Sequence, residues 1–453
     1  MKVLKTKIES ENEVHVGSSY VKDYFETLQF DDSWSFRGLT QKDTNYVTHG
    51  YHRYPAKFIP QLAARLITEI TKPGDLVVDP FMGSGTTLVE AKILGRPSVG
   101  VDINPVAVLI AQAKITPIVP DVLNLHFTKL AETIWHMESA QLFTVTETAV
   151  KYQAKTPDID RIDYWFRPKT KKKLSILFEK ITGIKDDKVR TFFLCGFSNI
   201  LKNCSIWMQK SNKPTRDFSK IIPDPYTIFL KHVKRMIMKN AEFWNLLQKN
   251  DTINVIAKPL CADARKVPVD DDSVSLVVTS PPYVTSYEYA DLHQLSALWF
   301  NFTNSLPEFR QRFIGSSANG TQRSAYYINS KLGKEIVNQL CNKRTGKSSE
   351  VAKYFHEMRE SFLEMKRYLK PGGKACIVIG DTCFRGVPVL NAEVFVEQMQ
   401  NVGFKISKII KRIIPSKNLP QTRDPKTGKF TASSNQDRIL AYPFEFIIIM
   451  EKS

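Results

Sequence analysis

Short runs of apolar and β-branched residues, typical of buried parallel strands, recur along this chain. Between several of them, apolar residues return at helical spacing, as in residues 55–70 and 87–94. The pattern predicts an α/β fold with a right-handed, doubly wound sheet that is mostly parallel and ends in an antiparallel pair. The expected strands are residues 75–80, 98–103, 253–263, 275–282, 375–381, 404–415 and 444–451.

The strand pattern stops over residues 106–250, where amphipathic helices alternate with basic, aromatic-rich connections. This stretch is too long for a connection inside one sheet, so it predicts a second, helical lobe inserted into an α/β domain of residues 49–105 and 251–453. Residues 1–48 are polar with scattered aromatic side chains, and they predict an irregular arm that packs onto another part of the protein.

A glycine-rich turn, DPFMGSGTT at residues 79–87, lies between the first strand and a helix. Gly83 and Gly85 allow a tight turn and close approach of a ligand, while the helix start offers free N–H groups. A phosphate-binding P-loop would need a lysine before the helix, and a dinucleotide fingerprint would have a third glycine at Leu88. Asp102 ends the next strand, where a carboxylate suits the two hydroxyls of a ribose.

A second motif, TSPPY at residues 279–283, follows another expected strand. Ligands of open α/β sheets bind at the carboxyl ends of the strands. The two prolines hold the backbone extended and remove two N–H donors, which leaves carbonyl acceptors beside the Ser280 hydroxyl and the Tyr283 ring. Such a segment suits an amine that must donate hydrogen bonds; the plainer interpretation is a rigid turn.

Together, the two motifs resemble those of the DNA amino-methyltransferases, which act on N4 of cytosine or N6 of adenine. VDINP (101–105), HRYPAKF (52–58) and CADA (261–264) are similar to further cofactor segments of that family. The resemblance implies a Rossmann-like, seven-stranded methyltransferase sheet and S-adenosylmethionine as the cofactor. Within the family, SPPY is more typical of the cytosine-N4 branch than of the adenine-N6 branch.

The resemblance also implies roles for particular residues. Ser280 and the Pro281 carbonyl would accept hydrogen bonds from the target amine, and Tyr283 would stack on the base. The glycine turn and the double-proline segment must then lie side by side at one rim of the sheet. The catalytic set is Ser280, Pro281, Pro282 and Tyr283, and the cofactor set is Lys57, Asp79, Phe81, Gly83, Gly85, Thr86, Asp102 and Asp263. A solvated lysine at a helix start is nearly as good an interpretation of Lys57.

Lys and Arg outnumber Asp and Glu by 64 to 46, for a net charge of +18. Such a charge favours nucleic acid as a partner, although it also occurs in merely soluble basic proteins. Residues 164–173 interleave aromatic and basic side chains, and the loop 416–438 is long and basic. The expected DNA-contacting residues, whose alternative is a solvated basic surface, are Arg167, Lys171, Lys172, Arg423 and Lys426.

Several functions are compatible with these motifs. The cofactor loop precedes the catalytic segment here, whereas many cytosine-N4 enzymes have the reverse order, so adenine N6 remains an alternative. An RNA guanine-N2 methyltransferase, whose motif is generally NPPY, and a non-enzymatic DNA-binding protein are the others. Carbon-5 methylation is set aside because the chain has no Pro-Cys pair.

The expected setting follows from these choices. We expect duplex DNA as the substrate and a separate restriction endonuclease as the functional partner. The six cysteines lack zinc-ligand spacing, so no metal is expected. No apolar run is long enough for a membrane span, and the start of the sequence lacks an apolar signal core, so we expect a cytoplasmic enzyme of a bacterial or archaeal cell, associated with the nucleoid.

Overall fold

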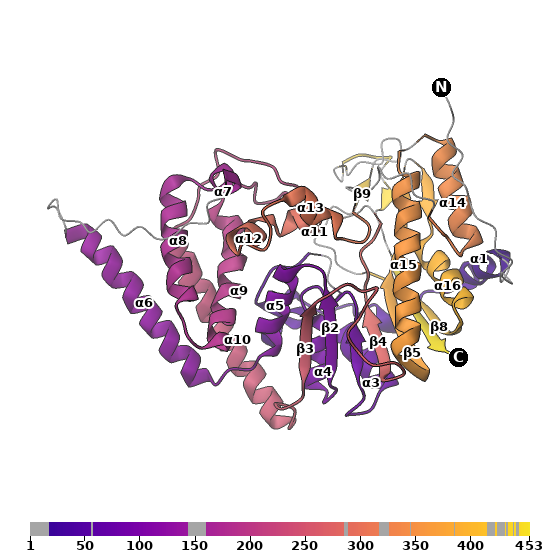
Figure 1. Cartoon of the computed structure of the whole chain (residues 1–453), viewed down its shortest axis with the longest axis horizontal. Helices are drawn as coiled ribbons and strands as arrows, with labels where there is room; N and C mark the ends of the chain where they lie inside the picture. The colour runs from indigo at the N-terminus through magenta and orange to yellow at the C-terminus, as the bar shows by residue number, and fades with distance from the viewer. Residues whose placement is uncertain are drawn as a thin grey trace.

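A seven-stranded sheet forms the centre of the protein in the computed structural model (Figure 1). The structure describes residues 18–55, 58–143, 160–284, 289–316, 326–344, 346–384, 386–414, 422–423, 431, 434–437, 439–440 and 444–453. The sheet consists of β1 (Val77–Asp79), β2 (Ser98–Asp102), β3 (Ala257–Cys261), β4 (Val274–Thr279), β5 (Leu369–Ile379), β8 (Phe404–Ile413) and β11 (Phe444–Lys452).

The strand order is β3-β2-β1-β4-β5-β11-β8, and only β11 runs antiparallel to its neighbours. This arrangement confirms the predicted seven-stranded, mostly parallel sheet and its antiparallel final pair. From β1 the chain continues outward on one side through β2 and β3, and it returns on the other side through β4 and β5. The gap between β1 and β4 is therefore the topological switch point, where open α/β sheets bind ligands.

Alternate strand residues face two different helical layers, which explains the nearly continuous apolar runs of the central strands. Val77 packs in one cluster with residues of α3 (Pro60–Ile70) and α4 (Thr86–Ile93). Val78 packs on the opposite face, in a cluster with α15 (Ser348–Tyr368) and α16 (Asn391–Asn401). Near them, α14 (Lys331–Asn342) packs against α15, while α5 (Pro105–Ile115) covers β2 and β3.

A second, helical body lies beside the sheet, at the left of Figure 1. Its helices are α6 (Pro120–Phe143), α7 (Asp160–Trp165), α8 (Pro168–Thr182), α9 (Asp187–Cys204) and α10 (Pro225–Lys249), together with α11 (Tyr289–Leu292), α12 (Gln294–Trp299) and α13 (Leu306–Gln311). One apolar cluster joins them, and it includes Trp165, Phe192 and Trp299. Along the chain, α6–α10 precede β3 and β4, whereas α11–α13 follow them, so the cluster combines helices from two separate segments. The division of the chain into arm, catalytic domain and recognition lobe stays a prediction.

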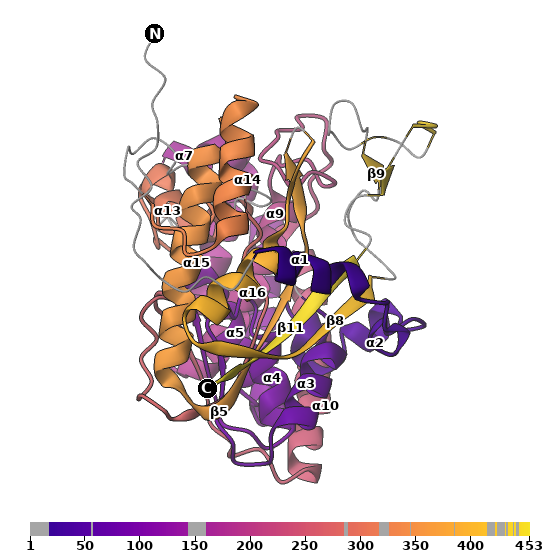
Figure 2. The same ribbon diagram turned by 90° about the vertical axis from the view of Figure 1, so that its right-hand side faces the viewer.

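Residues 30–34 of the N-terminal segment lie against the sheet edge formed by β8. The Asp31 N–H donates to the Lys411 carbonyl at 2.9 Å, and Trp34 is buried. Its helices are α1 (Ser18–Thr27), α2 (Gln41–Thr44) and the short 3₁₀ turns η1 (Asp32–Trp34) and η2 (Val47–Gly50). Figure 2 shows α1 running beside α16 and the C-terminal strands. Unpaired backbone groups of an edge strand are thereby partly covered.

Two short hairpins were not predicted from the sequence: β6 (Thr382–Phe384) with β7 (Val387–Val389), and β9 (Thr422–Arg423) with β10 (Ile439–Leu440). Each strand is only two or three residues long, too short for a periodic pattern to register. Among the residues that the structure describes, no helix is both long and apolar enough to span a bilayer.

Candidate active site

The turn after β1 needs glycine at two positions. Gly83 and Gly85 have φ angles of 48° and 77°, in the left-handed region where a side chain is strained. A Cβ on Gly85 would lie 2.8 Å from the Cβ of Ala111 in α5, and one on Gly83 would lie 3.1 Å from the Tyr54 ring. Gly85 is also the residue before α4, so the tight turn aims the start of that helix at the switch point.

Asp79 fastens this turn to the neighbouring strand. Its carboxylate accepts hydrogen bonds at 2.7 Å from the hydroxyls of Thr279, at the end of β4, and Thr87, in α4. The Phe81 N–H donates to the same group at 3.1 Å. Burial raises the pKa of Asp79 to about 6 against the opposing effect of these hydrogen bonds. The loops that follow β1 and β4 therefore leave the sheet side by side.

Asp102, at the end of β2, presents a half-buried carboxylate beside the glycine turn. It accepts hydrogen bonds from the backbone N–H groups of Gly83 (3.0 Å) and Asn104 (2.8 Å). Burial raises the pKa of Asp102 to about 7, since two hydrogen bonds only partly replace hydration. A carboxylate has about four lone-pair positions, so two remain for a ligand with two adjacent hydroxyls.

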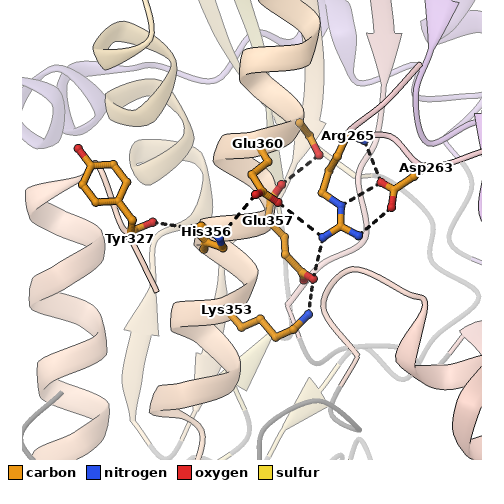
Figure 3. A network of polar contacts seen from close by, with 8 residues as sticks. Asp263, Arg265, Tyr327, Lys353, His356, Glu357 and Glu360 are labelled. Carbon is orange, nitrogen blue, oxygen red and sulfur yellow. Dashed lines mark hydrogen bonds and ion pairs between the residues drawn. The ribbon is translucent and has the colours of Figure 1, made fainter. Parts of the chain in front are cut away.

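Asp263, which follows β3, is held by a charged network on α15 (Figure 3). Arg265 grips its two oxygens, with Nε–Oδ1 at 3.0 Å and Nη2–Oδ2 at 2.7 Å. On its other side, Arg265 Nη1 lies 3.2 Å from Glu357 Oε1 and 3.6 Å from Glu360 Oε2. Burial raises the pKa of Asp263, but the hydrogen bonds from Arg265 outweigh this effect, and the net pKa lies below its ordinary value.

The double-proline segment is held from three other parts of the chain. The Tyr354 hydroxyl, on α15, donates to the Pro282 carbonyl at 2.8 Å. The Tyr283 ring lies against Gly380 after β5, where an added Cβ would come within 3.4 Å of it. The Tyr283 hydroxyl lies 3.5 Å from Glu445 Oε2 at the start of β11. Burial raises the pKa of Tyr283 well above its ordinary value, so the phenol stays protonated.

A cleft of about 840 Å³, open to solvent, brings the two motifs together. Of the residues predicted from the sequence, eight line the cleft: Asp79, Phe81, Gly83, Thr86, Asp102, Asp263, Ser280 and Pro282. The glycine turn and the double-proline segment thus share one rim, as predicted.

The other predicted residues stand apart from this lining. Gly85, Pro281 and Tyr283 are chain neighbours of lining residues. Gly85 packs against Ala111 in α5, and the Tyr283 ring lies against Gly380. Lys57 lies outside the described residues. Sequence reasoning missed Tyr54, Phe58, Tyr289 and the run Arg312, Phe313 and Ile314, all of which line the cleft. Tyr54 and Phe58 belong to the HRYPAKF segment, which carried a signal; the run 312–314 carried none.

The basic residues expected to contact DNA have different surroundings. Arg167, exposed at the start of α8, donates to the Phe218 carbonyl at 2.8 Å, and Lys171 pairs with Asp163 at 2.6 Å. Lys172 is exposed on the same helix. The backbone of Arg423 lies in β9, whereas Lys426 is outside the described residues. Within the described ranges, no cluster of His, Cys, Asp and Glu could hold a metal ion.

Comparison with known proteins adds a family to this geometry. A family model for DNA methylase matches residues 5–113 and 274–453. The Type II methyltransferase M.MvaI of Kocuria varians is 27% identical over 441 residues, which cover 91% of this chain and 94% of that protein. M.MjaII of Methanocaldococcus jannaschii (21% identical; 83% and 82% covered) and M.BsoBI of Geobacillus stearothermophilus (22%; 82% and 81%) are also Type II methyltransferases.

A solved SAM-dependent methyltransferase from Methanosarcina mazei aligns over 88% of this chain and 98% of its own, at 12% identity and a TM-score of 0.29. A likeness this weak adds nothing to the fold argument, which rests on the sheet itself. The family model spans well over half of the chain and includes both motifs of the cleft. The chain therefore belongs to the DNA methylase family of N6 and N4 amino-methyltransferases, enzymes that use S-adenosylmethionine as the methyl donor.

Proposed function

We propose that this enzyme methylates the N4 amine of cytosine in duplex DNA, as the modification enzyme of a restriction-modification system. The observation that carries the proposal is the shared cleft, where Gly83, Asp102 and Asp263 face Ser280 and Pro282. On one side it offers carboxylates that can bind hydroxyl groups. On the other side it offers a segment that can accept hydrogen bonds from an amine. The Type II relatives support a modification role.

The cleft fits the cofactor by the chemistry of its groups. Asp102 keeps two acceptor positions for the ribose hydroxyls, and Asp263 offers an acceptor to the adenine amine. Among the described residues, the Ser84 and Thr86 hydroxyls are buried without a hydrogen-bond partner, although both residues line the cleft. Buried polar groups are normally satisfied, so these two point to a polar ligand. In this proposal Phe81, Gly83 and Gly85 shape the turn, Asp79 anchors it, and Lys57 pairs with the methionine carboxylate.

S-adenosylmethionine supplies an electrophilic methyl group on its sulfonium when bound. The protein must make the target amine a better nucleophile, because its lone pair is delocalised into the base. Hydrogen bonds to Ser280 and the Pro281 carbonyl would favour a pyramidal nitrogen and stabilise the positive charge that develops there. Such preorganised acceptors are a large source of transition-state stabilisation, and fixed positioning supplies much of the rest.

The base must leave the DNA stack to reach the cleft. Unstacking costs a few kcal/mol, roughly, which stacking in the pocket and phosphate contacts offset. We assign the stacking role to Tyr283, whose ring is fixed between Gly380 and Glu445. The inserted lobe (106–250) is the proposed target-recognition region, and Arg167, Lys171, Lys172, Arg423 and Lys426 are the proposed phosphate contacts. An enzyme that methylates chromosomal DNA would act in the cytoplasm of a bacterial or archaeal cell.

The choice of cytosine N4 rests on the serine at the first position of the SPPY segment, by the family resemblance. The order of the motifs, with the cofactor loop first, is the observation that keeps adenine N6 as the second candidate. Both targets are conjugated exocyclic amines, so the same hydrogen-bond acceptors serve either one.

Mass spectrometry of nucleosides from DNA treated with the purified enzyme and S-adenosylmethionine decides between them. We expect N4-methylcytosine, formed more than 100-fold more slowly by the Ser280→Ala variant. N6-methyladenine instead would overturn the base assignment. Labelled methyl groups transferred to transfer RNA and not to duplex DNA would overturn the substrate assignment. A restriction-modification role further predicts that treated DNA resists a nuclease of the same specificity.

A further inference from the structure

One helix, α15, contacts both halves of the active site. In Figure 1 it runs alongside β5 and β4, on the opposite face of the sheet from α3 and α4. Tyr354 and Glu357 lie on it three residues apart, so they project from nearly the same side one turn from each other. Tyr354 reaches the catalytic segment, and Glu357 reaches the network around Asp263.

Tyr354 makes a specific contact in a rigid setting. Its side chain is fully buried, its ring packs 6.1 Å from that of Phe395, and an added Cβ on Gly315 would lie 3.3 Å from it. Burial raises the pKa of Tyr354 well above its ordinary value, so its hydroxyl remains a donor. That hydroxyl holds the Pro282 carbonyl, which limits how Ser280 and the Pro281 carbonyl can move.

Glu357 acts on the Asp263 side of the cleft indirectly, through the Arg265 side chain. Its side chain is only 7% exposed, and it contacts Lys353 as well as Arg265. Arg265 fills three acceptor positions of Asp263, two with its side chain and one with its backbone N–H at 2.9 Å. About one lone pair of that carboxylate then remains to accept an amine, and its direction is set by Arg265.

The sheet alone does not connect these two points. β3, which carries Asp263, and β4, which carries Ser280, are separated by β2 and β1. Three strand spacings of about 4.8 Å amount to roughly 14 Å. Any loop movement over that span would change the distance between the adenosine end of the cofactor and the target amine, and in-line transfer tolerates little such error.

We propose that α15 is a positioning helix that sets the distance between the cofactor-holding and amine-holding halves of the site, with Tyr354 and Glu357 as its two positioning residues. The inference rests on the proposed function for the meaning of the two halves. It assigns each residue a different kinetic effect: Tyr354 governs the transfer step, and Glu357 governs cofactor affinity.

Two conservative variants separate these effects in the full-length enzyme. Tyr354→Phe removes one hydroxyl and should lower the single-turnover methylation rate at saturating cofactor about tenfold, while S-adenosylhomocysteine still binds within about twofold of the wild-type Kd. Glu357→Gln should raise that Kd about fivefold and leave the saturated rate within about twofold. Tyr368→Phe is the matched control: this hydroxyl is on the same helix, is buried, and has no hydrogen-bond partner among the described residues. It should change neither quantity.

The inference is overturned if Tyr354→Phe behaves like Tyr368→Phe, or if both positioning variants alter rate and Kd together along with a lowered Tm. The second outcome would mean a merely structural role. Wild-type enzyme that fails to methylate DNA would instead refute the proposed function, since the binding measurement on Glu357→Gln needs no DNA. Methylation of adenine would change the target and leave the test of α15 intact.

Discussion

The half of the cleft that we propose holds the cofactor and the half that we propose is catalytic are built in different ways. Around Asp102, the geometry is set by backbone N–H groups and by glycines within about two dozen residues of one another. Around Ser280, it is set by Tyr354, Gly380 and Glu445, which come from three elements much later in the chain. A local turn needs few partners to form, whereas the catalytic segment depends on the packing of the whole sheet and its α15 layer.

Damage to the glycine turn should appear as lost stability or lost cofactor binding, because the turn is part of the core at α4 and α5. Damage to the double-proline segment should appear as lost transfer, because Ser280 and Pro282 line the cleft where the target amine is proposed to bind.

Ser280→Ala should have the largest effect. Loss of an acceptor that strengthens in the transition state costs about 3 kcal/mol, or more than 100-fold in the single-turnover rate. Cofactor Kd, measured by calorimetry, should stay within about twofold. Ser84→Ala is the control, because Ser84 lines the same cleft from the glycine turn. Equal rate losses in the two variants would contradict the division of roles.

Tyr283→Ala should lower the methylation rate about 50-fold, since base–aromatic stacking contributes about 1–3 kcal/mol. The cofactor should bind as before. Tyr283→Phe keeps the ring and loses only the hydroxyl near Glu445, so its rate should lie close to that of the wild type. Near-normal turnover by the alanine variant would remove the stacking role.

Gly85→Ala should lower the free energy of unfolding by about 2 kcal/mol, through backbone strain at φ 77° and a clash with Ala111. Gly74→Ala separates the two causes, because Gly74 has φ 91° but open space around the added Cβ. That variant should cost about 1 kcal/mol from strain alone. Denaturant unfolding measures both, and equal losses would mean that Ala111 accommodates the methyl group.

Cofactor affinity should depend on pH through Asp102. Its pKa of about 7 means that the carboxylate, the form that accepts both ribose hydroxyls, is lost as pH falls through 7. Binding should be about tenfold weaker at pH 6 than at pH 8. The Asp102→Asn variant should bind the cofactor weakly, and its affinity should change less with pH. Any pH dependence of its affinity that remains near pH 6 would come from Asp79, whose pKa is about 6. A flat wild-type profile would contradict this role.

The sequence predicted the cofactor half in more detail than the catalytic half, for reasons of distance along the chain. Strands, glycines and terminal carboxylates leave local patterns, so the strand at β1 and residues such as Gly83 and Asp102 could be predicted. The Tyr354 contact with Pro282 and the lining by Arg312 arise only when remote segments meet. Likewise, a basic run does not reveal that Lys171 already pairs with Asp163.

The central claim is that one cleft holds the cofactor and the target amine together. A crystal structure of the enzyme with S-adenosylhomocysteine tests it most directly. The account predicts the ribose on Asp102, the adenine on Asp263, and the sulfur directed at the Ser280 hydroxyl. A ligand bound elsewhere, or with its sulfur turned away from Ser280, would contradict it.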